Sequence, residues 1–504
     1  MKKIIITSIF LSSCLFGQEI FEGFNLNANS SKLEKEYTCV PLPPPKPPAQ
    51  HSGAEGLPPL PLPAVPLRRT EKKNPPRPPT LIAKVTTKNK SDWATNPSDT
   101  ENLLKWMAKN LNVNFSSINL PEDSIPSDPQ KVPLLYRTGH EPFTFSENTR
   151  EKLRNYIIGG GTIIFDSCCG RQDFFNSSFN ESKLIIPERP PYRLSKDHPI
   201  YHSFFDVDTI KYRKWVLETG LKNDVPSCIG IDIECRTAIF IFRWDLSCGW
   251  DNLPDSEKHH CLGYDIDTAK QLGSNLMSYI TAERSAALPL SKAIEFIDET
   301  KISSGKFIVG QIKYNSIWKT RETALPMLLD SFYEQTKIPV KFAITELSLD
   351  SPRIFDLPFV YMTGHNAFSL SESERQGLKY YVSRGGTILI ESCCGREAFD
   401  VSIRKELYKT FNQNLEEITS SEIYVYPNQV ITTNFSPALA KVIGKSHSKT
   451  MLYGIKNEGL YSVIYSPYGL SCGWSLSQCP YCKSYKNEDA MAIGVNILSY
   501  VILN

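Results

Sequence analysis

Cysteine and histidine side chains stand at matching places in two parts of this chain, and these residue types could carry out chemistry. His140 lies 28 residues before the pair Cys168-Cys169. His365 lies 28 residues before the pair Cys393-Cys394. An imidazole beside a thiol lowers the thiol pKa or takes its proton, so such a pair can act as a nucleophile. The same side chains ligate zinc, and cysteines of exported proteins often form disulfides.

The sequence around these residues is an internal repeat. Residues 133–171 and 358–396 align without a gap, and 20 of the 39 positions are identical. Chance would give roughly two identities, so the repeat indicates two copies of one domain.

Strand and helix signals alternate within each copy. In the first copy, residues 81–87 and 162–165 are apolar runs that predict buried strands. Ser146 precedes an amphipathic segment as a helix cap, and Ser371 holds the same place in the second copy. This alternation predicts one α/β domain of about 200 residues per copy, with a parallel sheet between two layers of helices.

The order of these signals resembles a known family. TGH, a serine-capped helix, paired glycines, a strand, CCG, SCGW and a final helix with a GxN sequence follow one another in both copies. This order resembles the bacterial "domain of unknown function 4159" family, which is similar to class I glutamine amidotransferase-like domains. The resemblance implies two tandem three-layer α/β/α, flavodoxin-like domains at residues 81–285 and 300–504, and it implies no established reaction.

The C-terminal ends of parallel strands meet at one edge of a sheet, and ligands bind there. We therefore expect the histidines and the paired cysteines to lie at that edge in each copy, with the SCGW cysteines nearby in loops. Charged residues of the CCG segments are further candidates for binding at this edge: Asp166, Arg171, Glu391 and Arg396. The two carboxylates could instead accept hydrogen bonds from the turn that follows them, which is the favoured interpretation.

Disulfides are the favoured interpretation of the cysteines, because each copy carries four equivalent ones in a chain predicted to be exported. Cys228 and Cys235 occur only in the first copy and could pair across adjacent strands. The sequence does not determine the connectivity. The candidates for pairing are Cys168, Cys169, Cys228, Cys235, Cys248, Cys261, Cys393, Cys394, Cys472, Cys479 and Cys482.

Zinc binding and catalysis are the competing interpretations. The cysteine spacings match no compact zinc motif except Cys479-Pro480-Tyr481-Cys482, which has no second pair in sequence, so no metal and no cofactor is predicted. The nucleophile position of the amidotransferase-like domains falls two residues before the paired cysteines, and no downstream His-x-Glu dyad is present. We therefore assign no catalytic residue. Cys168, Cys169 and His140, with Cys393, Cys394 and His365, remain candidates for a Cys-His hydrolase or transferase.

The N-terminal residues predict export. Lys2 and Lys3 precede a short apolar run, so residues 1–17 are predicted to be a signal peptide. Leu11-Ser12-Ser13-Cys14 resembles the lipobox of bacterial lipoproteins, which makes Cys14 a candidate for lipidation; the alternative is ordinary cleavage near Gly17 with Cys14 removed. Residues 18–80 are predicted to be a disordered linker, because 15 of the 40 residues from 41 to 80 are proline.

Composition limits the partners. The chain has 56 basic and 54 acidic residues, and this balance argues against nucleic acid. The sequence thus predicts a periplasmic or membrane-anchored lipoprotein of a bacterial envelope that binds or scaffolds another envelope protein or a small ligand. Its only membrane contact would be the N-terminal lipid.

Overall fold

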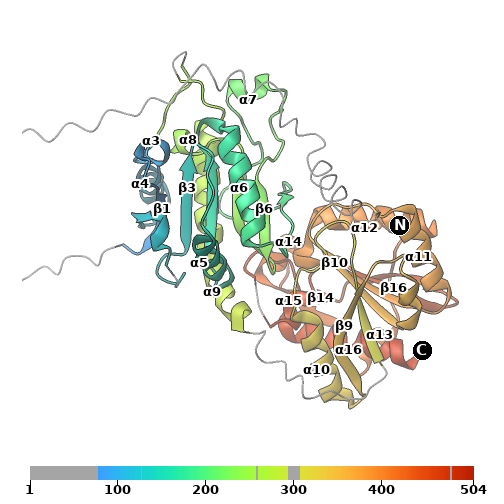
Figure 1. The fold of residues 1–504 in the computed structure, drawn as a ribbon. Helices are drawn as coiled ribbons and strands as arrows, with labels where there is room; N and C mark the ends of the chain where they lie inside the picture. The colour runs from blue at the N-terminus through green and yellow to red at the C-terminus, as the bar shows by residue number, and fades with distance from the viewer. Residues whose placement is uncertain (1–77, 127, 257–258, 293–306, 477–478) are drawn as a thin grey trace, which may run out of the picture.

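Two α/β domains lie side by side in the computed structural model (Figure 1). The structure describes residues 78–126, 128–256, 259–292, 307–476 and 479–504. The predicted signal peptide, Cys14 and most of the predicted proline-rich linker lie outside the described residues. Within the described parts of the chain, none of the helices is both long and apolar enough to span a bilayer.

The first domain is built on a seven-stranded sheet with the order β2-β1-β3-β4-β7-β6-β5. The strands β1 to β4 and β7 pair in parallel, while β6 pairs antiparallel with β7 and with β5. A two-residue turn, Glu234-Cys235, joins β6 to β7, and a turn this short can only connect antiparallel strands. The predicted parallel sheet is therefore right for five strands and wrong at one edge. The strands are β1 (Thr80–Thr86), β2 (Ser116–Pro121), β3 (Leu134–Gly139), β4 (Thr162–Ser167), β5 (Tyr192–Arg193), β6 (Ile229–Ile233) and β7 (Arg236–Phe242).

The second domain repeats this topology. Its sheet has the order β9-β8-β10-β11-β16-β15-β12, which matches the first sheet strand for strand, and its last two strands are again antiparallel. The repeat seen in the sequence is thus a repeat of a flavodoxin-like fold, as predicted. The strands are β8 (Phe307–Ile312), β9 (Val340–Leu347), β10 (Phe359–Gly364), β11 (Thr387–Ser392), β12 (Glu416–Glu417), β15 (Tyr453–Asn457) and β16 (Leu460–Ser466), with a separate ribbon of β13 (Thr432–Asn434) and β14 (His447–Lys449).

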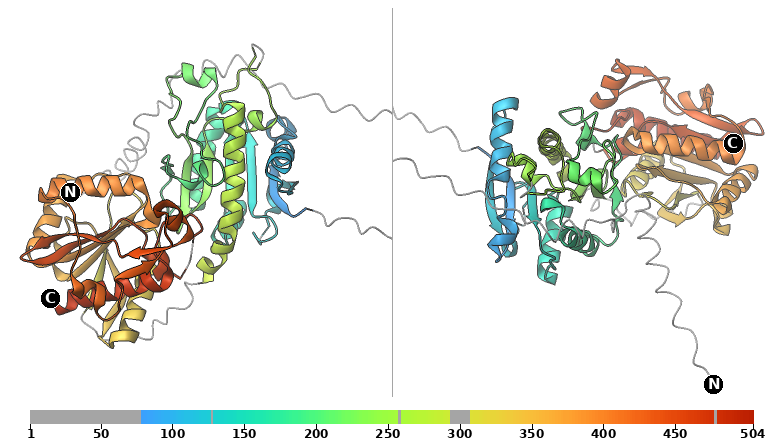
Figure 2. Two further views of the ribbon diagram at one scale, coloured as in Figure 1. Left: turned by 180° about the vertical axis from the view of Figure 1, so that it is seen from behind. Right: turned by 90° about the horizontal axis from the view of Figure 1, so that it is seen from above.

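Helices cover both faces of each sheet, and each face has its own apolar core. In the first domain α9 lies on the face opposite α5 and α6 (Figures 1 and 2). The main helices there are α4 (Asp99–Leu111), α5 (Glu147–Ile158), α6 (Gln172–Ile185), α8 (Ser247–Trp250) and α9 (Ile266–Lys292). Their counterparts are α10 (Ala324–Thr336), α11 (Glu372–Ser383), α12 (Glu397–Phe411), α15 (Ser471–Trp474) and α16 (Asn487–Leu503). Short helical segments are α3 (Lys90–Trp93), η1 (Glu122–Ser124), η2 (Cys168–Gly170), η3 (Pro199–Tyr201), α7 (Lys214–Glu218), η5 (Pro352–Asp356), η6 (Cys393–Gly395), α13 (Ser421–Val425) and α14 (Pro437–Ile443).

The predicted serine caps are present in both copies. The Ser146 hydroxyl accepts a hydrogen bond from the Thr149 amide at the start of α5. Ser371 forms a full capping box with Glu374 at the start of α11. Both caps satisfy amides that the first helical turn leaves without an intrahelical partner.

The first domain also caps a helix of the second. The Asp197 carboxylate accepts hydrogen bonds from the amides of Glu397 (2.9 Å) and Ala398 (3.5 Å), in the first turn of α12. Arg396, which precedes α12, donates to the carbonyl oxygen of Asp197 at 3.1 Å. The sequence made Arg396 a candidate for binding at the sheet edge of its own domain. In the structure this side chain instead joins the two domains.

Replacing Asp197 with alanine should weaken the second domain although the mutation lies in the first. We expect the free energy of unfolding to fall by about 1 kcal/mol, because amides of α12 lose their acceptor. Urea denaturation followed by circular dichroism measures this change. The control is Asp208→Ala, which alters an exposed aspartate of the same domain. Equal shifts for the two variants would contradict the capping role.

Candidate metal centres

The paired cysteines form the turn between a central strand and the helix after it. β4 ends at Ser167, and the chain reverses through η2 before α6 begins. Cys169 has a φ of 51° and Cys394 has a φ of 57°, so both occupy the left-handed region. Residues other than glycine enter this region at a cost, and the surrounding contacts must hold them there. One such contact is the hydrogen bond from the Cys169 amide to the Asp245 carboxylate.

A buried carboxylate at each strand end holds the SCGW segment in place. Asp166 accepts hydrogen bonds from the Tyr136 hydroxyl (2.7 Å) and from the amides of Leu246 and Ser247 (both 3.1 Å). The two amides lie at the start of the SCGW segment and the hydroxyl comes from β3, so none of these donors belongs to the turn after the carboxylate, and that part of the prediction is wrong. The segment itself was expected in a loop and is the short helix α8.

The second domain repeats this arrangement. Glu391 accepts hydrogen bonds from the Tyr361 hydroxyl (2.5 Å), from the Ser471 amide (3.0 Å) and from the Leu470 amide. The two carboxylates therefore position SCGW, and with it Cys248 or Cys472, against the CCG turn.

Four potential metal ligands converge in the first domain. The Cys169 and Cys248 sulfurs are 3.9 Å apart. His259 Nε2 lies 3.7 Å from the Cys169 sulfur and 3.6 Å from the Cys248 sulfur. The Cys261 sulfur completes the group, and the four ligand atoms all lie within 4.8 Å of one another. Three of the residues are buried and His259 is partly buried.

These separations fit a tetrahedral zinc site. With Zn–S bonds of about 2.3 Å and Zn–N bonds of about 2.05 Å, a regular tetrahedron has S···S edges of about 3.8 Å and S···N edges of about 3.6 Å. The separations among Cys169, Cys248 and His259 lie within about 0.1 Å of these edges, whereas a disulfide would need sulfurs about 2.05 Å apart. The carbonyl oxygen of Pro254 lies 3.5 Å from His259 Nδ1, where it can accept a hydrogen bond from Nδ1–H and leave Nε2 for a metal.

The equivalent cysteines form a second group in the other domain. The sulfurs of Cys394, Cys472 and Cys482 lie within 4.8 Å of one another, and the Cys394–Cys472 separation is 3.6 Å. Cys479, three residues before Cys482, also interacts with Cys394 and Cys482. The CPYC segment therefore meets its partner cysteines in space, from the CCG turn and from α15.

The predicted disulfides are not confirmed. Among the eleven cysteines that the structure describes, no two are joined by a disulfide bond. Cys228 and Cys235 flank opposite ends of the strand β6 and do not face each other across adjacent strands. Four groups of side chains are close enough together to hold a metal ion, and the sequence spacing did not indicate them because their members meet only through the fold.

The predicted histidines lie in different surroundings. The Thr95 hydroxyl oxygen lies 3.5 Å from Nδ1 of His140. In contrast, His365 is buried beside Cys393 and faces Asp232 of the first domain. Arg171 is half-buried at the start of α6. Sequence reasoning missed His259 as a partner of the cysteines, although its place two residues before Cys261 was a usable signal.

Buried cations accompany both groups of thiols. Burial opposes the charge of Arg213, but the nearby Cys261, Asp255 and Cys248 together raise its pKa above the ordinary value. In the second domain burial likewise opposes the charge of Arg321, but the surrounding thiols raise its pKa above the ordinary value. Hydrogen bonds from neighbouring thiols lower the pKa of Cys472 well below its usual range. Burial raises the pKa of Cys261, Cys394 and Cys482, so among these ligands the surroundings favour the thiolate, the form that binds metal, at Cys472.

A separate cavity lies at the strand ends of the first sheet. It has a volume of about 670 Å³ and includes Thr86 at the end of β1, Pro121 at the end of β2, and Arg137 of β3. The Arg137 guanidinium lies 3.9 Å from the centre of the Phe143 ring and pairs with Glu122. In the second domain the region around Trp318 and Glu346 holds a smaller cavity of about 250 Å³, which Asp232 of the first domain helps to line.

Two flavodoxin-like domains with cysteine-rich groups at the ends of their central strands define the class of protein. Residues 81–281 and 308–502 match the family model described as a domain of unknown function (DUF4159), and the chain belongs to this family. A search of curated proteins gives no match.

One solved structure that resembles the chain is a putative phosphosugar isomerase from Silicibacter pomeroyi DSS-3. It is 11% identical, the match covers 62% of this chain and 75% of that chain, and the TM-score is 0.16. Values this low carry no information about activity.

Replacing Asp166 with alanine should loosen α8 and the thiols behind it. We expect the free energy of unfolding to fall by about 3 kcal/mol, because three buried donors lose their acceptor. Thermal denaturation of the full chain measures this loss. Asp173→Ala, which alters an exposed aspartate of α6, is the matched control and should change little. If the Asp166 variant is as stable as the control, the carboxylate does not position SCGW.

Proposed function

We propose that this protein is an exported, lipid-anchored protein of the bacterial envelope with two domains that bind or scaffold a partner and are each braced by a structural zinc ion. The observation that carries the proposal is the tetrahedral spacing of the cysteine and histidine ligands in the first copy, together with the convergence of the three equivalent cysteines in the second. Zinc would take the bracing role that the sequence suggested for disulfides.

The surroundings of the thiols support a structural ion over a catalytic one. Cys248 and Cys261 are fully buried, and Cys472 and Cys482 are only 2% and 1% exposed. A closed site with four protein ligands leaves no position for substrate or water, whereas catalytic zinc keeps one open. Zinc would also protect these thiols from oxidation outside the cytoplasm.

The binding role rests on the cavity at the ends of β1, β2 and β3. In a doubly wound sheet, ligands bind outside the carboxyl ends of the strands, where the strand order reverses. The first sheet reverses between β1 and β3, and the cavity includes Thr86 and Arg137 from these strands. The walls combine an apolar ring, Phe143, with charged groups, which suits a small polar ligand or an extended segment of a partner.

A Cys-His hydrolase or transferase is the alternative. The left-handed backbone of Cys169 and Cys394 at a strand-to-helix turn favours it, since nucleophiles of related α/β enzymes occupy such strained turns. Burial argues against an enzymatic role, because Cys169 is only 9% exposed and Cys394 only 5% exposed. Neither cavity described above has a cysteine in its wall.

Zinc binding is tested by measuring metal in the purified mature protein. We expect Cys261→Ser and Cys482→Ser each to lose one zinc ion per chain relative to the wild type, and the melting temperature to fall by roughly 10 °C. Cys228→Ala removes a buried cysteine outside both groups and should retain all of the metal.

The control for disulfides is a comparison of chelator and reductant. Under the proposal, a strong zinc chelator lowers the melting temperature while a reductant alone does not. The reverse result would support disulfides. A single cysteine per domain that reacts rapidly with iodoacetamide in the metal-loaded protein would favour the enzymatic alternative.

Lipid anchoring is tested at Cys14. Because the lipid would be the only membrane attachment, Cys14→Ser should move the exported protein from the membrane fraction to the soluble fraction. Cell fractionation followed by mass spectrometry of the mature N-terminus provides the measurement. A wild-type chain cleaved near Gly17 without a lipid would contradict the anchor and leave export intact.

A further inference from the structure

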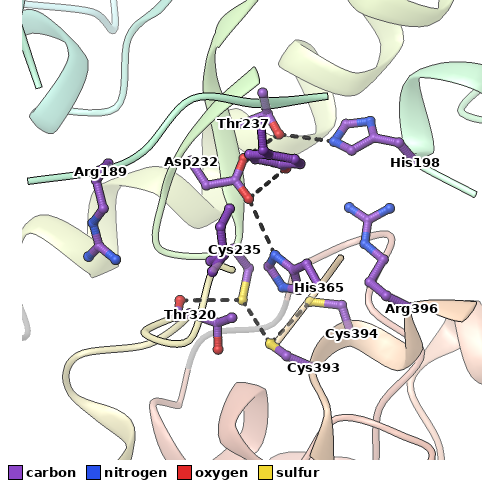
Figure 3. Close-up of polar contacts among 12 residues, drawn as sticks. Arg189, His198, Asp232, Cys235, Thr237, Thr320, His365, Cys393, Cys394 and Arg396 are labelled. Atoms are coloured by element: carbon purple, nitrogen blue, oxygen red, sulfur yellow. Dashed lines mark hydrogen bonds and ion pairs between the residues drawn. The ribbon is translucent and has the colours of Figure 1, made fainter. Parts of the chain in front are cut away.

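One cysteine of the first domain lies among the cysteines of the second. Cys235, in the turn between β6 and β7, is 4% exposed and belongs to a buried cluster with the five cysteines at the strand end of the other domain. Its sulfur lies 3.4 Å from the Cys393 sulfur. The Cys393 and Cys394 sulfurs are 3.8 Å apart (Figure 3). The cluster therefore contains more thiols than a single tetrahedral ion can use.

His365 completes a second set of ligands beside them. Its ring lies between the Asp232 carboxylate and the sulfurs (Figure 3), and it is 2% exposed. Nδ1 lies 3.3 Å from an oxygen of Asp232. Nε2 is buried and makes no hydrogen bond among the described residues. A carboxylate that holds one ring nitrogen and leaves the other for a metal is the usual environment of a zinc-bound histidine.

We propose that Cys235, His365, Cys393 and Cys394 bind a second zinc ion of the second domain, which joins the two domains. The four ligand atoms lie within 4.8 Å of one another, and all four residues are buried. Cys394 would bridge the two ions, since its sulfur also lies 3.6 Å from that of Cys472. The inference rests on the proposed function through this shared thiolate.

The chemistry involves no change of oxidation state. The divalent ion displaces the protons of the Cys235 and Cys393 thiols into solvent, and it shares the Cys394 thiolate with the first ion. His365 would release any proton on Nε2 to solvent, bind through that nitrogen, and keep a hydrogen bond from Nδ1–H to the Asp232 carboxylate. A second ion also reduces the negative charge of the buried thiolates, which would be costly without compensation.

The two copies differ at the positions that the proposal requires. Cys235 corresponds to Gly459, and the turn Glu458-Gly459 is exposed in the second copy, whereas Glu234-Cys235 is buried. Asn96 of the first copy corresponds to Arg321, which donates a hydrogen bond to the Cys235 sulfur at 2.9 Å. Cys235 and Arg321 therefore occur together at a cluster to which both domains contribute, whereas their counterparts in the other copy carry neither a thiol nor a charge.

The inference is tested by counting zinc in the full mature chain, purified with a non-thiol reductant and without chelator. We expect three ions per wild-type chain and two in Cys235→Gly. Glycine is the residue of the same turn in the other copy, so this variant should keep the hairpin. Cys394→Ser should retain a single ion, because it removes the bridging ligand of both centres in the second domain.

Two histidine variants give a matched comparison that does not depend on the hairpin. His365→Ala should lose one ion, while His140→Ala, the equivalent change in the first copy, should lose none. Circular dichroism confirms that each variant is folded.

The outcomes separate this inference from the proposed function. Two ions in the wild type and two in Cys235→Gly would overturn the interdomain site and leave one structural ion per domain. No tightly bound zinc in the wild type would overturn both. A Cys235–Cys393 disulfide, seen by mass spectrometry after alkylation without reductant, would also overturn the interdomain site.

Discussion

The burial of sulfur atoms at the end of each central strand is the constraint on which the site depends. A thiolate inside a protein needs a nearby positive charge or a metal, because water no longer solvates it. Arg213 in the first domain and Arg321 in the second supply part of that charge. The ions that we propose would supply the rest. The cysteines lie in the CCG turns, in the SCGW helices and in the loops that follow them, so ligation would hold these separate segments together.

The two domains use one scaffold for two different clusters. In both copies a carboxylate at the strand end, Asp166 or Glu391, anchors the SCGW helix and brings its cysteine to the CCG turn. The fourth ligand differs, being His259 in the first copy and the candidate Cys479 in the second. Loop residues can change in this way because the sheet and the carboxylate fix the rest of the geometry.

Contacts between the domains make the strand end of the second copy different from that of the first. The β6–β7 turn of the first domain reaches the strand end of the second, where Asp232 faces His365 and Cys235 approaches Cys393. The equivalent strand end of the first domain keeps the larger cavity. One copy therefore offers space for a ligand or partner, while the corresponding surface of the other is largely used to join the domains.

The sequence by itself determined the repeat, the α/β class, the capped helices and the place of the paired cysteines, since these depend on local periodicity and turn chemistry. Its favoured disulfides are not confirmed, and it did not group the cysteines with His259, because these ligands come from separate segments that share no fixed spacing along the chain. Only the tertiary structure decided that His259 joins the first cluster and that Cys235 joins the second. The physical reason is that sulfur and nitrogen atoms meet through sheet topology and domain packing, and neither is encoded in the distance between residues along the sequence.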